Sequence, residues 1–506
     1  MTAQLLSCLM ILLSSVLPDQ LHANELSVAD VFTDNSVLQQ SMSVPVWGVA
    51  PPGQHVTVRF AGQSKSTKAL KDGAWKVHLS PLNAESKGTT LLVQSGDQKI
   101  EFNNVVVGEV WYASGQSNMQ MKLDACVRKS PAIRQLVEDQ GRLDVRILRV
   151  EEADSAEPSH LLIKKPMWQV DSSGARKQQS AVAWFFAREL QQKLNVPIGI
   201  IEGSWGGKPI EGFIPRDQFP KYELLNNILQ LADQDKLDDV AELEGGVIIR
   251  NTAGMPGRIF NARIAPIAPY AIKGFLWYQG ESNAGRGEDP RHYRSKMRAL
   301  VDGWRNAWSQ PSLPFYFVQL PAFNDTATGW VRLREEQRLS LSIAKTGMAV
   351  TIDLRDPDIH PANKFDVGKR LALWAMAGTY QMDEPCSGPL FRSATVEGHS
   401  IRVEFDHVSD GLMAAEKTGV DLPTETSASL SHFELANKTG QWLSANAIIK
   451  GKSVVVSSPS VFNPVAVRYA CSGGPANANL YNLHGLPASP FCSDLHLLPW
   501  QQMQQK

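Results

Sequence analysis

The stretch VVVGEVWYASGQSNMQM, at residues 105–121, decides the fold of this chain. Its first part, VVVGEVWYA, is an almost uninterrupted apolar run, which is typical of a strand buried on both faces of a sheet. The polar, glycine-containing segment 114–119 follows at once, where such a strand would end. The pattern therefore predicts a central strand over 105–113 with polar side chains at its carboxyl end.

Further along the chain, short apolar runs alternate with amphipathic helical patterns. We expect four more strands, at 198–201, 273–278, 315–320 and 348–352. One helix is expected to begin after Ser180 and to end at Asn195, and another is built around apolar residues in 297–308. Strands separated by helices form a parallel sheet that is covered on both faces, so the predicted fold class is α/β.

Alternating β patterns lie on both sides of this α/β region. The segments HVTVRF and WKVHL, with the turn signals PPG and KDG, predict a β-sandwich-like domain over 24–104. The segments IRVEF, SHFEL and SVVVSS predict a second β-rich region over 385–506. Between them, residues 105–384 form the α/β domain, with a charged helical insertion at about 225–250.

Composition and charge restrict the class of partner. The chain of 506 residues is 43% apolar and 20% charged, which excludes disordered, collagen-like and coiled-coil proteins. Lys and Arg number 50 and Asp and Glu number 51, so the formal net charge is −1. A neutral chain of this size lacks the basic surface that nucleic acids or anionic membranes attract. A small or neutral partner is expected, and the oligomeric state is left open.

The N-terminal segment predicts export. Residues 5–17 form an apolar run of signal-peptide length that is too short to cross a bilayer, and small Ala23 precedes a cleavage point. We therefore expect a signal peptide at 1–23 and a periplasmic or extracellular protein. No other segment approaches the ~20 apolar residues of a membrane helix.

Removal of that segment would leave four cysteines, which allow zero, one or two disulfides. They are Cys126, Cys386, Cys471 and Cys492. A bond between Cys471 and Cys492 is one of the alternatives. The sequence has no CxxC motif and no Cys/His cluster with metal-ligand spacing, so we expect neither a metal nor a cofactor.

Candidate site residues are expected where the predicted strands end, because ligands of open α/β sheets bind at the carboxyl ends of the strands. The segments that follow four of the five strands are polar or glycine-rich: 114–119, 203–207, 279–283 and 353–360. The first contains Ser117 and the last contains His360. Together the four segments hold a serine, a histidine, carboxylates and amide donors, which are the components of a serine hydrolase.

A serine hydroxyl is hardly ionised at neutral pH, so Ser117 needs a base to act as a nucleophile. His360 is the candidate, because the imidazole pKa of ~6.5 suits proton uptake and return. A tetrahedral intermediate also needs N–H donors for its oxyanion. The backbone N–H of Ser117, that of Gly206 or Gly207 and the Gln279 amide are candidates. Each feature also has an ordinary structural explanation, such as a helix N-cap or a tight turn.

Five longer segments contain or follow these residues: GEVWYASGQSNMQM (108–121), GSWGGKPIEGF (203–213), IFNARIAPIAPYAIKGFLWYQGESNA (259–284), DIHPANKFDVGKRLALWA (358–375) and NLYNLHGLPASPFCSD (479–494). They resemble motifs of the sialate O-acetylesterase family of carbohydrate esterases, within the SGNH-type hydrolases. The resemblance extends from about residue 105 to the end of the chain. It implies an SGNH-hydrolase-like α/β sheet.

The same resemblance implies roles for individual residues. Ser117 matches the nucleophile and His360 the catalytic histidine. Gly207 and Gln279 match the oxyanion positions, with Gly206 as the close alternative. No metal or cofactor is implied.

The acid of the triad departs from the family pattern. SGNH enzymes commonly place an Asp three residues before the histidine, and this position holds Pro357. We prefer Asp358, because a residue two positions away in an extended segment faces the same side as the histidine. The other carboxylates near the predicted site are Asp356, Asp353 and Glu281. A Ser–His dyad oriented by a backbone carbonyl is a further alternative.

The resemblance implies removal of O-acetyl groups from a sugar, either a sialic acid or a polysaccharide such as acetylated xylan. Trp205, with Trp277 and Tyr278, is a candidate apolar wall for the sugar ring, although core packing also explains Trp277. Glu281 and Asn118 are expected to support the catalytic groups. A non-catalytic carbohydrate-binding protein is the alternative of a different class, and retention of both candidate catalytic residues argues against it.

Overall fold

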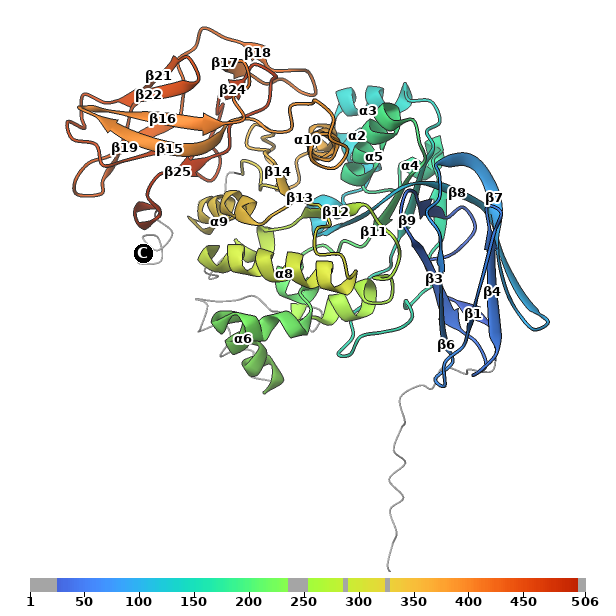
Figure 1. The fold of residues 1–506 in the computed structure, drawn as a ribbon. Coiled ribbons are helices and arrows are strands. Elements are labelled where there is room, and N and C mark those ends of the chain that lie inside the picture. The colour runs from blue at the N-terminus through green and yellow to red at the C-terminus, as the bar shows by residue number, and fades with distance from the viewer. Residues whose placement is uncertain (1–24, 235–253, 285–289, 324–327, 499–506) are drawn as a thin grey trace, which may run out of the picture.

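The computed structural model of the chain describes residues 25–234, 254–284, 290–323 and 328–498 (Figure 1). The expected signal peptide at 1–23 lies outside the described residues. Of the expected insertion at 225–250, the first part lies in helix α6 (Glu223–Asp233), and residues 235–250 lie outside the described residues.

A parallel sheet forms the centre of the fold. Its strands run in the order β10-β9-β11-β8-β12-β13-β14. The bounds are β8 (Gln98–Gly115), β9 (Val145–Arg149), β10 (Trp168–Val170), β11 (Ile198–Glu202), β12 (Gly274–Tyr278), β13 (Phe315–Val318) and β14 (Thr346–Ala349). Neighbours from β9 to β14 are parallel, and β10 adds an antiparallel edge. All five expected strands are present, and β9 is a parallel strand that was not expected.

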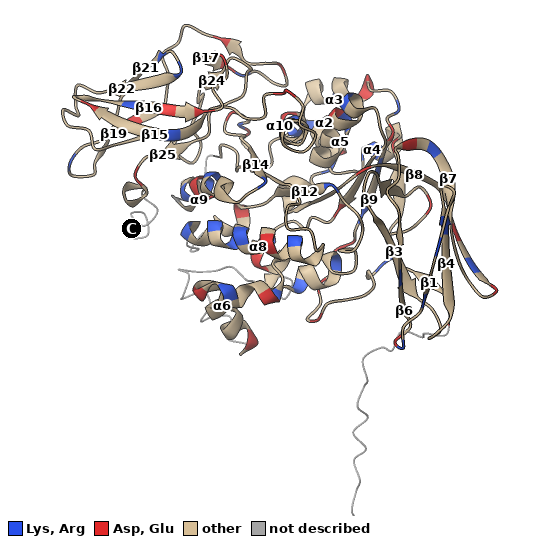
Figure 2. Ribbon diagram, in the orientation of Figure 1, with Lys and Arg blue, Asp and Glu red and all other residues tan. Residues whose placement is uncertain are grey.

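Helices lie on both sides of these strands (Figure 1). Helices α2 (Leu123–Lys129), α3 (Pro131–Glu138), α5 (Ala181–Leu194) and α10 (Lys364–Gly378) lie on one side, and α6, α8 (Tyr293–Ala307) and α9 (Thr328–Leu339) on the other. The Ser180 hydroxyl accepts the Ala183 N–H at 3.2 Å, and Asn195, with φ of 53°, ends α5. Figure 2 shows both signs of charge together on α9, where Arg332 pairs with Glu336. The mixed α/β architecture is therefore confirmed.

Strand β8 connects the N-terminal strands to the central sheet. Its first part pairs with β7 (Glu85–Ser95) and β2 (Val37–Gln39), and its last part pairs with β11 and β12. The other N-terminal strands are β1 (Ser27–Val28), β3 (Val44–Val49), β4 (His55–Phe60), β5 (Gln63–Lys68) and β6 (Ala74–Leu79). Because the hydrogen-bonded ladder is continuous, the expected boundary between residues 104 and 105 falls inside one strand.

The C-terminal region is built of short antiparallel strands. They are β15 (Leu390–Glu397), β16 (Ser400–Asp406), β17 (Leu412–Glu416), β18 (Thr424–Glu425), β19 (Phe433–Ala436), β20 (Trp442–Ser444), β21 (Asn446–Lys450), β22 (Ser453–Ser457), β23 (Ala466–Tyr469), β24 (Leu480–Asn482) and β25 (Phe491–Cys492). Cys471 and Cys492 are free thiols here, and Cys471 Sγ lies 3.2 Å from the carbonyl oxygen of Phe491. The structure thus lacks the disulfide that the sequence offered as one alternative. No described helix has the length and apolar content needed to cross a membrane.

Candidate active site

Strand β8 places Ser117 at the carboxyl-terminal edge of the central sheet. Gly115, with φ of 137°, ends the strand, and a Cβ atom at this position would lie 2.0 Å from the carbonyl oxygen of Tyr278. A glycine is therefore required where β8 passes β12. Ser117 then begins the short helix α1 (Ser117–Gln120), so its N–H has no intrahelical acceptor.

The loop after β14 brings an imidazole to this serine. His360 Nε2 lies 2.8 Å from Ser117 Oγ, and His360 Nδ1 lies 3.2 Å from Asp358 Oδ1. An N–H at Nδ1 donates to Asp358, which leaves the Nε2 lone pair to accept the Ser117 hydroxyl. The three residues form a continuous hydrogen-bonded chain from carboxylate to hydroxyl. This is the geometry that nucleophilic catalysis by serine requires.

The other candidate acids have different partners. Both oxygens of Asp353 bind the Arg370 guanidinium. Asp356 accepts backbone N–H groups of its own loop, and Glu281 accepts from Asn118. Among the described carboxylates, the one bonded to the imidazole is the preferred Asp358.

Electrostatics keep this chain in the protonation state that a general base needs. Lys129 Nζ lies 2.5 Å from Asp358 Oδ2, and this bond lowers the pKa of Asp358 to about 2. Partial burial lowers the pKa of His360 below its ordinary 6.5, although Asp358 acts in the opposite direction. At neutral pH, Asp358 is therefore ionised and His360 is neutral.

The loop after β11 lies against the serine. A Cβ atom on Gly206 would be 3.5 Å from Ser117 Cβ. The Gly206 N–H donates to Gln120 Oε1 at 3.0 Å, so it is already used. Gly207 has φ of 68°, a left-handed conformation that favours glycine, and open space where a Cβ atom would be.

Gln279 lies in a buried hydrogen-bond network beside the candidate nucleophile. Its buried Nε2 donates to Gln116 Oε1 at 3.1 Å, to Asn283 Oδ1 at 2.7 Å and to the Lys208 carbonyl at 3.3 Å. Its Oε1 accepts the Tyr293 hydroxyl at 2.7 Å. In this geometry both amide protons of Gln279 already have acceptors, so the oxyanion role, which stays a prediction, requires one of these hydrogen bonds to break. Gln279 also holds the residue that precedes the candidate nucleophile.

A buried polar chain lies behind the candidate catalytic groups. Asn118 Nδ2 donates to Glu281 Oε1 at 2.5 Å and to the Ile359 carbonyl at 3.1 Å. Asn118 Oδ1 accepts from Lys364 Nζ at 2.5 Å. The expected supporting pair of Glu281 and Asn118 is thus brought together. Lys364 was missed, although it lies in the DIHPANK segment that also contains His360.

The aromatic residues of the expected sugar wall separate into two groups. Trp205 is partly exposed and lies beside Gly206, with Lys208 Nζ 4.7 Å from its ring centroid. Trp277 and Tyr278 are fully buried, and Trp277 packs edge-on against Trp304. Trp277 and Tyr278 therefore belong to the core and have no surface for a ligand, whereas Trp205 has.

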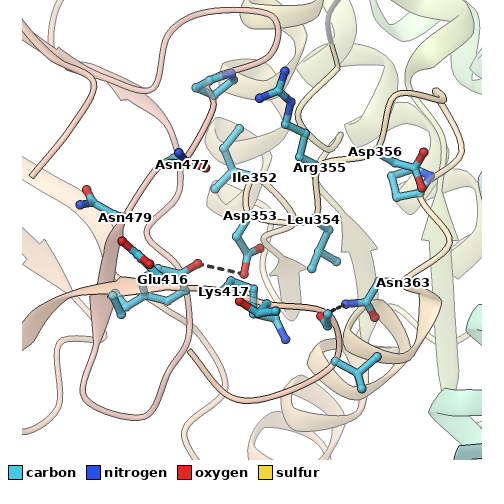
Figure 3. Close-up of a pocket in the computed structure, with 18 of the residues that line it drawn as sticks. Ile352, Asp353, Leu354, Arg355, Asp356, Asn363, Glu416, Lys417, Asn477 and Asn479 are labelled. Carbon is cyan, nitrogen blue, oxygen red and sulfur yellow. Dashed lines mark hydrogen bonds between the residues drawn. The ribbon is translucent and has the colours of Figure 1, made fainter. Parts of the chain in front are cut away.

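The loop with His360 also borders a cavity of about 720 Å³ (Figure 3). On the facing side lie residues of the C-terminal region, among them Glu416, Lys417, Asn477 and Asn479. The Tyr481 hydroxyl donates to Asp353 Oδ2 at 3.3 Å, and Asn363 Nδ2 donates to the Gly419 carbonyl at 2.9 Å. The C-terminal region therefore holds the histidine loop near both of its ends.

Replacement of Arg370 by methionine should destabilise the fold at the start of this loop. Its guanidinium donates to the two oxygens of Asp353 at 2.6 and 2.7 Å, and both side chains are buried. Loss of one partner of a buried pair costs about 3–5 kcal/mol. Urea denaturation of Arg370→Met, with the neighbouring Lys369→Met as control, measures this loss. A free energy of unfolding equal to that of the control would contradict the assignment.

No group of three or more His, Cys, Asp or Glu side chains suited to a metal ion occurs in the described ranges.

The chain is similar to known carbohydrate acetylesterases. Residues 255–376 match the family described as carbohydrate esterase, sialic acid-specific acetylesterase. Sialate O-acetylesterase of Homo sapiens is 28% identical over 512 residues, which is 92% of this chain and 91% of that protein. The Rattus norvegicus sialate O-acetylesterase is 30% identical over 410 residues, covering 71% of this chain and 75% of that protein. A carbohydrate acetylesterase from Xanthomonas citri, known from its crystal structure, is 33% identical with a TM-score of 0.80, covering 93% of this chain and 99% of that one.

Proposed function

The chain belongs to the sialate O-acetylesterase family of carbohydrate esterases, and from this membership we infer that it hydrolyses O-acetyl esters of carbohydrates. It is a carboxylic ester hydrolase. The family that the sequence motifs predicted is confirmed. The catalytic roles, the sugar and the cellular location are proposals that build on this assignment.

The observation that carries the mechanism is the 2.8 Å contact between Ser117 Oγ and His360 Nε2, with Asp358 on the other imidazole nitrogen. His360 takes the hydroxyl proton as Ser117 Oγ attacks the acetyl carbonyl carbon. Asp358 keeps the imidazole in the tautomer that accepts at Nε2 and stabilises the imidazolium that forms. A non-catalytic carbohydrate-binding protein would not need this hydrogen-bonded arrangement of carboxylate, imidazole and hydroxyl.

The tetrahedral intermediate carries a negative oxygen that needs donors in fixed positions. The N–H groups of Ser117 and Gly207 are the proposed donors, with Gly206 available if Gln120 moves away. Collapse of the intermediate breaks the bond to the sugar oxygen, which takes the proton from His360. Water then attacks the acetyl-enzyme with His360 as base, which releases acetate and restores the Ser117 hydroxyl.

The substrate is proposed to be an O-acetylated sialic acid, with acetylated xylan or another polysaccharide as the alternative. Partly exposed Trp205 supports binding of a sugar ring, because an indole face stacks on the apolar face of a pyranose. Acetate release from O-acetylated sialic acid, acetylated xylan and an aryl acetate distinguishes these substrates. Release from the aryl acetate alone would contradict both sugar assignments, and no release from any of the three would contradict the mechanism.

The pH dependence of the wild-type enzyme should show a single acid limb. His360 must be neutral to accept the Ser117 proton, so kcat/KM falls as the pH drops through the pKa of His360. Burial holds this pKa below 6.5. The pKa of Asp358, at about 2, adds no loss within the measurable range. A pH series with an aryl acetate should give a midpoint below 6.5, and a midpoint well above this value would contradict the assigned base.

The wider organisation is also proposed. The parallel strand order supports an SGNH-type catalytic region over 105–384, with β regions at 24–104 and 385–506. The contacts from Tyr481 and Gly419 to the histidine loop support a structural role for the C-terminal region. Export to the periplasm or the exterior is proposed from the N-terminal apolar segment alone.

A further inference from the structure

Lys364 is a charged residue without solvent contact beside the proposed catalytic centre. It is the first residue of α10 and has no exposed surface. Its Nζ lies 2.5 Å from Asn118 Oδ1 and 5.3 Å from the centroid of the Tyr278 ring. Burial of an ammonium group is costly, so its presence here needs an explanation. The mechanism above assigns it no role.

We propose that Lys364 is a positioning residue that fixes Asn118, and through it the backbone before His360, and that its buried positive charge acts against a second positive charge on His360. This inference rests on the proposed function of Ser117 and His360. It assigns the lysine no contact with substrate.

The first part of the proposal follows from donor and acceptor chemistry. A lysine ammonium only donates, so it requires the oxygen of the Asn118 amide to face it. The carboxylate of Glu281 and the carbonyl of Ile359 only accept, so they require the amide nitrogen. The Asn118 amide therefore has one orientation that satisfies all its partners. In that orientation it joins the turn after β8 to the residue that precedes His360.

The second part follows from charge. Burial lowers the pKa of Lys364 to about 8, so the ammonium form still predominates at neutral pH. The titratable groups facing it are Cys126 of α2, Glu281 after β12, Asp356 of the histidine loop and Lys129 at the end of α2. Burial also raises the pKa of Glu281.

His360 faces Asp358, which favours the imidazolium, and Lys364 and Lys129, which oppose it. Of the two lysines, Lys129 is partly exposed and already bound to Asp358. Lys364 is fully enclosed, so its charge is screened less by water. Removal of the charge on Lys364 should therefore raise the pKa of His360.

The test compares Lys364→Met with Lys364→Gln. Methionine removes both the charge and the donor, whereas glutamine removes the charge and retains an N–H donor. For an aryl acetate, Lys364→Met should lower kcat by about 10- to 100-fold with little change in KM, because the His360 loop loses its fixed position. Glutamine should lower kcat less. In both variants the acid limb of kcat/KM should move to higher pH.

Lys417→Met is the matched control. Lys417 is also a lysine with a mostly covered side chain that is bound to α10, with its Nζ 2.8 Å from Asp366 Oδ2, but it does not contact the Asn118 chain. Its loss should leave the acid limb where the wild type has it. An NMR titration of Lys364→Gln measures the pKa of the His360 imidazole independently of activity. This measurement tests the inference even if the methionine variant does not fold.

An acid limb and a His360 pKa that do not change in Lys364→Gln would overturn the inference. The proposed function fails in a different way, namely if Ser117→Ala keeps the esterase activity. If the wild-type activity depends on Ser117 but the acid limb of Lys364→Gln lies at the wild-type pH, the result contradicts only the role of Lys364 and leaves the proposed function intact.

Discussion

Ser117→Ala should abolish acetyl ester hydrolysis, with a fall in kcat of at least about 10⁴-fold. Alanine keeps the backbone of α1 and removes the oxygen that lies 2.8 Å from His360 Nε2. Without that oxygen no acetyl-enzyme can form, and the remaining donors can only polarise the ester for attack by water. The measurement is acetate release from an aryl acetate and from O-acetylated sialic acid.

The matched control for this variant is Ser172→Ala. The Ser172 hydroxyl accepts the Ala175 N–H at 3.2 Å and caps helix α4 (Ser173–Arg176), which is the ordinary structural role of a serine at a helix start. Its loss should change stability by about 1 kcal/mol and leave kcat within a few-fold. If Ser117→Ala behaved like this control, Ser117 would be only a helix-terminal residue.

Asp358→Asn should give the second largest loss, about 10²- to 10³-fold in kcat. A buried acid in this role is worth about 10⁴-fold in other enzymes. Asp358 is 44% exposed on its side chain, so water replaces part of its effect. Loss of its negative charge should also lower the pKa of His360, which moves the acid limb to lower pH, opposite to the shift expected for Lys364→Gln.

Asp356→Asn is the control for the acid. Its carboxylate binds backbone N–H groups of the same loop at 3.0 and 3.2 Å and does not contact the imidazole. A loss of less than about 10-fold in Asp358→Asn, with no shift of the acid limb, would favour a Ser–His dyad. A larger loss of kcat in Asp356→Asn than in Asp358→Asn would mean that Asp356, and not Asp358, is the acid.

The main strands could be predicted from sequence because apolar runs are visible without knowledge of packing. Strand β9 was missed because its sequence, VRILR, carries two arginines. The structure shows how one of them is accommodated. Buried Arg146 donates to the carbonyls of Asn35 and Asn104, at the N-terminal strands. These hydrogen bonds, which allow an arginine to be buried, are tertiary contacts, so no local sequence pattern predicts them.

The sequence could predict which site residues lie together only where the ends of the strands determine their positions. Ser117, His360 and Asp358 meet because their segments follow β8 and β14 at the same edge of the sheet. The direction of the Gln279 side chain depends on Gln116 and Asn283, which no spacing rule places.

Buried polar residues are the second feature that sequence patterns do not predict. Lys364 could not be singled out from the sequence, because lysine side chains are normally exposed. Its burial arises because α10 packs against α5 and because the Lys364 ammonium reaches Asn118 in the turn after β8, which only the assembled fold shows. For Trp277 and Tyr278, which the sequence offered as a sugar wall with core packing as the alternative for Trp277, the structure shows core positions.

The most direct test of the mechanism is to trap the acetyl group on the enzyme. Wild-type protein mixed with excess aryl acetate and quenched in acid within one turnover should gain the mass of one acetyl group, and peptide mapping should locate it on Ser117. The same treatment of Ser117→Ala should give no added mass. An acetyl group on any other residue during turnover, or turnover by wild type without acetylation of Ser117, would contradict the account.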